Sequence, residues 1–390
     1  MKIVGIICEY NPFHLGHKKQ FDIIRRHFQE EVAIVCLMSG NFVQRGMPAI
    51  VDKSLRARAA IDCGADLVLE LPATYALRSA EGFAAGGVEI LSGFCDYLCF
   101  GCETGDSEKL LATARALLSS EFSLALREEL DKGLSFPVAR QSALMEMGAD
   151  ASCLSHPNDI LGVEYCKAIL SQNSPLLPLP IHREGNYHAE LPDGENPSAT
   201  AVRSQMLAGE SWQAYVPVGT ETVFSQAKLH SLTWGERAVL SRLRSMTEEE
   251  WESIPFGSEG LWRKLMSAAR SCSTLEEILA ATKSKRYTRT RLDRMVMCAY
   301  LGITRELLES SVPYVRVLGF RQNATGILKQ ARQIGLFPHT GEKMDHPYQA
   351  MELLWDDLYG LFGETPVAPG QTHRRRAYIC GKYVPSRAAA

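Results

Sequence analysis

The sequence has no long hydrophobic run, and this absence excludes the simplest kind of membrane protein. No apolar stretch reaches the roughly 18 residues that a membrane-spanning helix needs, although hydrophobic residues make up 46% of the 390-residue chain. The apolar run near the N-terminus is only one strand long, so it lacks the pattern of a signal peptide. We therefore expect a cytoplasmic protein with no membrane partner.

The chain also lacks a strong charge of either sign. Its formal net charge is −3 and its isoelectric point is near 6.4, so the chain as a whole has no electrostatic signature of nucleic-acid binding. Any contact with RNA or DNA must therefore come from a local basic patch. At 390 residues the chain is too long for one ordinary domain, and we expect two domains of unequal size.

Metal-binding patterns are scarce as well. The chain has eleven cysteines, which in a cytoplasmic protein of this size are expected to be reduced thiols and not a disulfide framework. Cys99 and Cys102 have CxxC spacing, but no second CxxC or histidine pair follows at the spacing of a zinc site. We expect buried thiols at the end of a strand and no metal site.

The start of the chain combines a buried strand, a turn and a helix. Residues 3–7 are mostly β-branched, which is typical of a buried parallel strand, and Asn11 and Pro12 end it. Gly16 allows the backbone to approach a ligand closely, and apolar residues recur at helical spacing over 17–28. The free N–H groups and the positive dipole end of that helix favour a nucleotide's phosphates at this turn.

Two histidines, His14 and His17, lie three residues apart in this turn. Imidazoles beside an anion site can donate hydrogen bonds to phosphate oxygens as charge grows on them during attack at the α-phosphorus. A bare HxGH match also occurs by chance, as an ordinary turn histidine followed by a helix residue. The position after the first strand favours the catalytic interpretation, because strand, turn and helix are the context that the motif requires.

Strands and helices alternate through the first two hundred residues. This alternation predicts an α/β fold with a parallel sheet and right-handed crossovers. The expected strands after the first are 31–38, 67–71 and 97–100, and the expected helices are 52–63 and 80–91. Ligands bind beyond the carboxyl ends of such strands. The polar turns expected at that edge are 9–17, 39–45, 70–72 and 101–105.

The pattern changes further along the chain. Residues 107–172 are mainly helical, and Pro178 and Pro180 make 176–181 an edge strand or an extended segment. Beyond residue 210 helical segments dominate, at 258–269, 275–281, 290–301, 326–334 and 348–361. We therefore expect a boundary near residues 215–217, between a nucleotide-binding catalytic domain at 1–215 and a mainly helical domain at 216–390.

Two charged segments near the sheet edge have more than one interpretation. Arg45 lies in a long polar turn, where it can pair with a phosphate or a small carboxylate or stay exposed in a solvated loop. Asp52, Lys53, Arg56 and Arg58 are expected to form the charged face of a helix, with ion pairs between residues four apart.

Two later helix starts offer further contacts for a nucleotide. Asn158 and Asp159 can cap a helix or hydrogen-bond to a base or ribose, and both possibilities stay open. Ser198 and Thr200 place hydroxyl groups at a helix N-terminus, with Arg203 one turn later, so this SxTxxR segment offers several donors to a triphosphate. Helix capping alone would also explain it.

A basic cluster lies between residues 283 and 294. Tyr287 lies within it, so the cluster suits a phosphate backbone with an unpaired base, and RNA is the expected partner. A solvated charged helix face is the alternative, and the basic run at 373–376 is a second phosphate contact or a mobile tail. The six cations of the cluster, set against Asp293 alone, are Lys283, Lys285, Arg286, Arg289, Arg291 and Arg294.

The HxGH turn and the SxTxxR segment together resemble the HIGH-type nucleotidyltransferase superfamily, which has a Rossmann-like catalytic domain. Longer strings resemble one family within it, the bacterial tRNA(Met) cytidine acetate ligases, over nearly the whole chain. The strings EYNPFH, MSGNFVQRG, PAIVDK, ELP, CFG and KRYTRTR begin at Glu9, Met38, Pro48, Glu70, Cys99 and Lys285.

This resemblance implies an ATP-dependent ligase. Such an enzyme activates acetate as acetyl-adenylate with release of pyrophosphate. It then acetylates the wobble cytidine of elongator tRNA(Met), giving N4-acetylcytidine. Mg²⁺ would balance the triphosphate through water, without a dedicated carboxylate cage. A metabolic adenylyl- or cytidylyltransferase that acts on a small phosphate ester is the alternative, but it has no use for the basic cluster.

The residue patterns above and the resemblance together give expected roles to individual residues, and the resemblance supplies the nucleotide site at 7–20 with Gly101, Asn158 and Arg183. His14, His17 and Arg203 would be catalytic, and Lys283, Lys285, Arg286, Arg289 and Arg291 would bind RNA. The residues expected to bind the nucleotide are Ile7, Cys8, Glu9, Tyr10, Asn11, Pro12, Phe13, His14, Leu15, Gly16, His17, Lys18, Lys19, Gln20, Gly101, Asn158, Arg183, Ser198 and Thr200.

Overall fold

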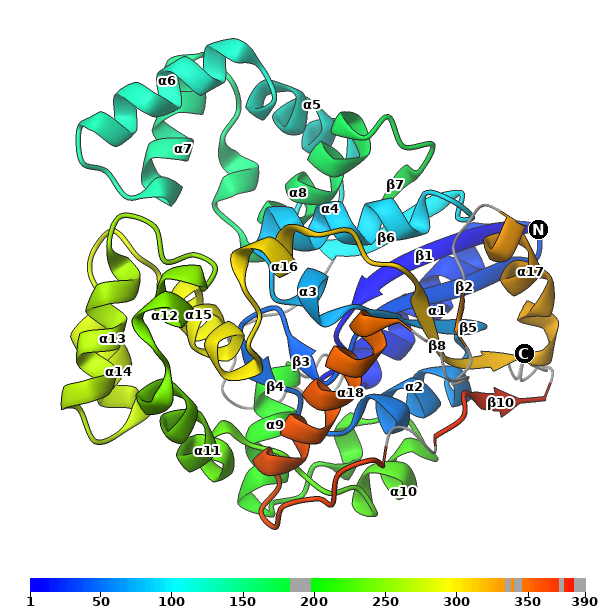
Figure 1. Cartoon of the computed structure of the whole chain (residues 1–390). Coiled ribbons are helices and arrows are strands. Elements are labelled where there is room, and N and C mark those ends of the chain that lie inside the picture. The colour runs from blue at the N-terminus through cyan, green and yellow to red at the C-terminus, as the bar shows by residue number, and fades with distance from the viewer. Residues whose placement is uncertain (183–197, 334–337, 340–345, 372–374, 382–390) are drawn as a thin grey trace.

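A mostly parallel sheet forms the centre of the molecule (Figure 1). The computed structural model describes residues 1–182, 198–333, 338–339, 346–371 and 375–381. In the described residues the strand order is β10-β8-β5-β2-β1-β6-β7, and β9 pairs with β8 off this path. The strands are β1 Lys2–Cys8, β2 Val32–Ser39, β5 Leu67–Leu71, β6 Tyr97–Cys102, β7 Leu177–His182, β8 Val315–Arg321, β9 Pro338–His339 and β10 Tyr378–Cys380.

The part of the sheet built from the first half of the chain is parallel, as the alternation of strands and helices predicts. β1 lies between β2 and β6, β2 pairs with β5, and β6 pairs with β7. β7 is the outermost strand on its side of the sheet, which confirms the edge position expected from its two prolines. The carboxyl ends of β1, β2, β5 and β6 therefore share one edge.

Helices cover both faces of the sheet. Successive side chains of a strand point to opposite faces, and here apolar side chains on both faces are buried under helices. In β1, Ile3 and Ile7 belong to one core, whereas Val4 and Ile6 belong to the other. The first core is closed by α4 Ala80–Leu91, α5 Ser107–Leu117, α8 Pro157–Ser171 and α17 Thr325–Gln333. The second is closed by α1 Leu15–His27, α2 Lys53–Asp62, α9 Ala199–Ala208 and α10 Thr220–Ser225.

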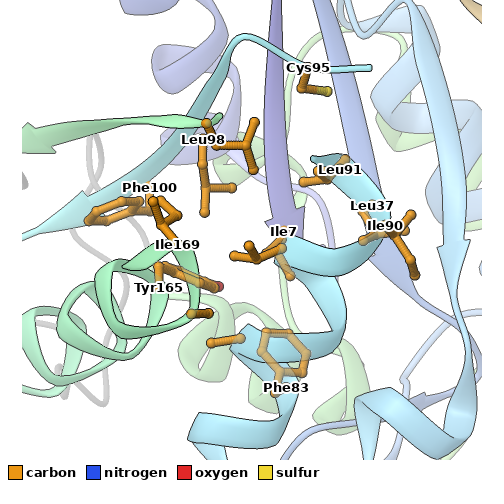
Figure 2. Packing of buried hydrophobic residues seen from close by; sticks show 14 of the residues in the cluster. Ile7, Leu37, Phe83, Ile90, Leu91, Cys95, Leu98, Phe100, Tyr165 and Ile169 are labelled. Carbon is orange, nitrogen blue, oxygen red and sulfur yellow. The ribbon is translucent and has the colours of Figure 1, made fainter. Parts of the chain in front are cut away.

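The carboxyl end of β1 is fixed by close packing on the first of these cores. Figure 2 shows Ile7 of β1 between Phe83 of α4 and Tyr165 of α8. Gly87 allows α4 to come this close, since a Cβ atom there would lie only 2.3 Å from Cδ1 of Ile7. Such dense packing leaves little freedom to the strand from which the histidine turn departs.

The sheet also takes strands from the second half of the chain, which the sequence pattern did not indicate. β8 pairs antiparallel with β5, and β10 pairs parallel with β8. Because β8 is antiparallel to β5, its first residues lie at the carboxyl edge of the parallel strands and Arg321 lies at the opposite edge. The division into domains at 1–215 and 216–390 stays a prediction, but the sheet itself extends across it.

The rest of the second half is helical, as expected, and packs around its own core of buried aromatic side chains, among them Trp251, Tyr300 and Trp355. Figure 1 places these helices on the side of the sheet toward which β1 points. None of the described helices is long and apolar enough to cross a membrane. The helices are α11 Leu232–Ser245, α12 Glu248–Ser253, α13 Leu261–Ser271, α14 Leu275–Thr282, α15 Arg289–Leu301, α16 Arg305–Glu309 and α18 Pro347–Tyr359.

Candidate active site

The histidine turn connects β1 to α1 and is closed by the histidines themselves. His14 is the N-cap of α1, and its Nδ1 accepts a hydrogen bond from the backbone N–H of Gly16 at 3.1 Å. Nδ1 of His17 accepts from the backbone N–H of His14 at 3.2 Å. The backbone N–H of His17 also donates to the His14 side chain, and this bond and the one from His14 N–H to His17 form a capping box with imidazoles in both positions. α1 begins at Leu15, two residues earlier than its apolar periodicity indicates.

The capping box fixes which ring nitrogen of each histidine is a donor. A neutral imidazole that accepts a hydrogen bond at Nδ1 carries its proton on Nε2. Nε2–H is therefore the donor group of both His14 and His17. The two rings are stacked, with centroids 3.7 Å apart and planes inclined by 26°. Two adjacent donors of this kind at a helix N-terminus suit a phosphate group.

Aromatic side chains hold the two imidazoles in place. The ring of His17 lies 4.7 Å from that of Tyr10 and 5.5 Å from that of Phe13, centroid to centroid, and both supporting rings are buried. Gly16 also leaves room for the ring of His14, because a Cβ atom at position 16 would make a tight contact of 3.0 Å with its Cε1 atom. This steric reason adds to the expected close approach of a ligand.

The remaining residues of the 7–20 segment differ in what they can offer a nucleotide. The side chains of Ile7, Tyr10 and Phe13 belong to the buried cores, so these residues can reach a ligand only through backbone atoms. Lys18 pairs with Asp22 on the next turn of α1. Their nucleotide-binding roles stay predictions.

Asn11 joins the histidine turn to two other segments. Its Oδ1 accepts a hydrogen bond from the backbone N–H of Ile50 at 2.8 Å, and its carbonyl accepts from Nη1 of Arg203 at 2.6 Å. Nη2 of Arg203 donates to Thr200 Oγ1 at 3.0 Å, and Ser198 caps α9 by accepting from Ala201 N–H. The structure thus brings the SxTxxR segment onto the HxGH turn, as a shared site requires.

Next to β1, the end of β6 is closed by reciprocal hydrogen bonds. Asn158 Nδ2 donates to Glu103 Oε1 at 2.7 Å, and Asp159 accepts from the backbone N–H groups of Glu103 and Thr104, both at 2.9 Å. Asn158 therefore braces the loop that follows Gly101, and a contact with base or ribose remains a prediction. Arg183, the other expected ligand on this side, lies outside the described residues.

The polar turn after β2 forms a small hairpin of β3 Phe42–Val43 and β4 Met47–Pro48. The backbone N–H of Gln44 donates to Glu9 Oε1 at 2.9 Å, which ties the hairpin to the end of β1. Its tip packs on α15: Gly46 has φ +75°, and a Cβ atom there would lie 2.6 Å from the backbone of Asp293. Arg45 is exposed at this tip.

The expectation of an exposed charged face on α2 is wrong for two of its four residues. Lys53 is 3% exposed and Arg56 is fully buried, whereas Arg58 and Asp62 do form a pair four residues apart, at 3.5 Å. The charge of Lys53 is matched by carboxylates distant in sequence, and the guanidinium of Arg56 donates to backbone carbonyl groups, so a local pattern reveals neither environment. The run of alanines after Arg56 was the available signal of a helix buried on most sides.

Lys53 belongs to a buried ion cluster at the carboxyl ends of β2 and β5. Its Nζ lies 2.7 Å from Glu70 Oε1 and 2.8 Å from Asp356 Oδ2. Arg316 lies 3.1 Å from Glu352 Oε2 and 3.5 Å from Asp356 Oδ2. Burial alone would lower the pKa of Lys53, but Asp356 and Glu70 outweigh it and raise that pKa. The cluster joins α2, β5, β8 and α18 beside the candidate site.

The basic cluster at 283–294 is less positive in space than in sequence. Arg289 makes two hydrogen bonds of 2.8 Å to Glu276 and one to Asp293. Arg291 donates to the Phe256 carbonyl, and Arg294 is buried. Arg286 pairs with Glu259, which also accepts from Tyr287. Lys283 and Lys285 are exposed, and no ion pair involves either of them among the described residues.

No described group of three or more His, Cys, Asp or Glu side chains is arranged to hold a metal ion. All eleven cysteines are free thiols, as expected. Burial raises the pKa of Cys99 to about 12 and that of Cys102 to about 11, so the thiolate form that metals and electrophiles require is rare at neutral pH.

Comparison with known proteins gives consistent matches over most of the chain. A family model described as HIGH Nucleotidyl Transferase matches residues 1–370. A protein of Acetivibrio thermocellus named tRNA(Met) cytidine acetate ligase is 36% identical over 400 residues, which cover 94% of this chain and 96% of the relative. A protein of Clostridium novyi with the same name is 37% identical over 358 residues, or 87% and 89% of the two chains.

Solved structures agree with these matches. The crystal structure of Thermotoga maritima TmcAL without ligand has a TM-score of 0.89 and 30% sequence identity to this chain, and covers 98% of this chain and 100% of its own. The same protein bound with alpha-thio ATP has a TM-score of 0.86, with the same identity and coverage.

Proposed function

Because this chain belongs to the HIGH nucleotidyl transferase family, we propose that it is an ATP-dependent ligase that acetylates the wobble cytidine of elongator tRNA(Met). Its relatives named tRNA(Met) cytidine acetate ligase match almost end to end, and a similar protein has been solved with an ATP analogue. The structural observation that carries the proposal is the paired-imidazole capping box at the start of α1.

The first step is the activation of acetate. An acetate oxygen attacks the α-phosphorus of ATP, the bond from that phosphorus to the bridging oxygen of the leaving group breaks, and pyrophosphate departs. Negative charge grows on the phosphate oxygens during the attack. The Nε2–H groups of His14 and His17 therefore donate to these oxygens most strongly in the transition state. Arg203, held by the Asn11 carbonyl and Thr200, supplies positive charge for the triphosphate.

The second step is acyl transfer to RNA. The exocyclic amine of cytidine attacks the acetyl carbonyl, the mixed anhydride bond breaks, AMP leaves and the amine loses a proton. Neither step needs a covalent intermediate on the protein. The attacking amine is a weak nucleophile, so its placement beside the adenylate supplies much of the rate.

The RNA contact is proposed for the cluster Lys283, Lys285, Arg286, Arg289 and Arg291. Lys283, Lys285 and Arg286 are exposed and therefore best able to meet a phosphate backbone. The hairpin connects this region to the histidine turn, since Gly46 packs on α15 while Gln44 is bonded to Glu9. An RNA bound at the cluster would thus lie beside an element that reaches the end of β1.

Mg²⁺ is proposed to enter with the nucleotide. The described residues offer no carboxylate set that fits a dedicated Mg²⁺ cage, and this ion commonly binds through phosphates and water. Neither of the two proposed reaction steps depends on a metal ligand from the described residues.

The direct test is mass spectrometry of tRNA nucleosides after incubation of the protein with ATP, isotope-labelled acetate and bulk tRNA. We expect labelled N4-acetylcytidine in elongator tRNA(Met), dependent on ATP. A metabolic nucleotidyltransferase would leave the tRNA unlabelled and would instead consume ATP or CTP with a small phosphate ester.

A further inference from the structure

Arg56 of α2 is fully buried, and within the described part of the chain its guanidinium bonds only to backbone carbonyl groups. Its Nε donates to the Val51 carbonyl at 2.8 Å, and its Nη1 donates to the Ser39 carbonyl at 3.2 Å and to that of Glu9. Nη2 donates to the Gly40 carbonyl. One guanidinium thus connects the end of β1, the end of β2 and the loop that leads into α2.

Two of these acceptors, the carbonyls of Glu9 and Gly40, directly follow the last paired residues of β1 and β2. Beyond the last pair of a parallel ladder, backbone carbonyls have no neighbour strand and need another donor when they are buried. A guanidinium offers five donors in a fixed plane and meets several such carbonyls at once. The arrangement has a cost, since burial disfavours the charged form and lowers the pKa of Arg56. A buried charge without a carboxylate partner is therefore a costly way to obtain stability alone.

We propose that Arg56 is a positioning residue for the histidine pair, an inference that rests on the proposed function. It holds the carbonyl of Glu9, from which residues 10–13 lead directly to His14. It also holds Val51, the neighbour of Ile50, whose N–H is bonded to Asn11 Oδ1. One side chain thereby holds the histidine turn directly at its start and, through Val51 and Ile50, in its middle.

The opposite edge of the sheet carries a matched control. Arg321 is 4% exposed, and its guanidinium also donates to backbone carbonyls, those of Ala65 and Ile61. These carbonyls lie before the start of β5, at the amino edge of the parallel strands. Arg56 and Arg321 are therefore similarly buried and both donate to backbone carbonyls, although Nη1 of Arg321 also donates to Cys380 Sγ at 3.8 Å. Of the two, Arg56 is the one that adjoins the histidine turn.

The experiment compares Arg56→Lys with Arg321→Lys in the full-length protein. Lysine keeps the charge but cannot serve several carbonyls in one plane, so both variants should melt at a lower temperature. Acetate-dependent exchange of labelled pyrophosphate into ATP is measured below both transitions. We expect Arg56→Lys to lower kcat by about 10- to 100-fold, because a displacement near 1 Å has effects of that order. The KM for ATP should change by less than about threefold, and Arg321→Lys should keep kcat within about twofold of wild type.

Equal losses of kcat in the two variants would overturn the proposal, because both effects would then follow from lost stability. A wild-type kcat in Arg56→Lys would overturn it as well. If Arg56→Lys does not accumulate, Arg56→Gln replaces it, because glutamine has a smaller planar group that can also donate. The same loss of kcat is expected. An inactive wild-type protein would instead contradict the proposed function, so the two failures are distinguishable.

Discussion

Glu352 of α18 has a charge state set by its immediate neighbours. Its side chain is 6% exposed. Burial, opposed by Arg316 and helped by the negative charge of Glu70, raises its pKa to about 7. Tyr314 donates a hydrogen bond to the same carboxyl group. The ion cluster therefore gains or loses one charge close to neutral pH.

The variant Glu352→Gln tests this state through the pH dependence of stability. The folded pKa lies above the unfolded one, so the folded protein binds the proton more tightly. The stability contributed by protonation is complete below about pH 4.5 and is lost as pH rises through about 7. The unfolding free energy of wild type relative to Glu352→Gln should fall between these values by up to about 1.4 kcal/mol per pH unit. Chemical denaturation at several pH values measures the difference, and parallel profiles for the two proteins would contradict it.

In the segment from α14 to α15, some cations make bonds within the protein, whereas two lysines form no ion pair among the described residues. Arg289 is held by Glu276 and Asp293, which raise its pKa, and Arg291 is bonded to a backbone carbonyl and stacked on Tyr287. Lys283 and Lys285 lie in the exposed connection between the two helices. The arginines of this segment thus contribute to the fold, whereas the two lysines are exposed to a binding partner.

Charge reversal in this connection should affect RNA and not the fold. In Lys283→Glu/Lys285→Glu, tRNA binding should weaken, and the slope of log K against log salt should become shallower by about 2, near one unit per lost phosphate contact. The melting temperature should stay unchanged. Arg289→Gln is the comparison, and it should lower the melting temperature. Filter binding across a salt series provides the measurement, and an unchanged slope in the lysine variant would exclude these two lysines from the RNA contact.

At the scale of the whole molecule, local patterns in the sequence predicted most helices and parallel strands. The pairing of β8 and the partners of the buried charges depend on residues distant in the sequence, which local patterns do not show. The parallel strands and their helices follow from periodicity within a few residues. β8 was missed because its pairing with β5 joins segments about 250 residues apart. The same limit applies to the site. The histidine turn can be recognised from four consecutive residues, whereas the burial of Lys53 depends on its ion pair with Asp356, 303 positions away. Arg286 likewise pairs with Glu259, 27 positions away.

The proposed activity requires the two imidazoles of the capping box to act on the α-phosphate of ATP. His14→Asn and His17→Gln remove one imidazole each but keep side chains suited to the N-cap and N3 positions, so the start of α1 should remain intact. Acetate-dependent exchange of labelled pyrophosphate into ATP is the most direct measurement. We predict that each variant folds, as judged by its melting temperature, and exchanges about 100-fold or more slowly than wild type. Exchange at the wild-type rate in both folded variants would contradict the account.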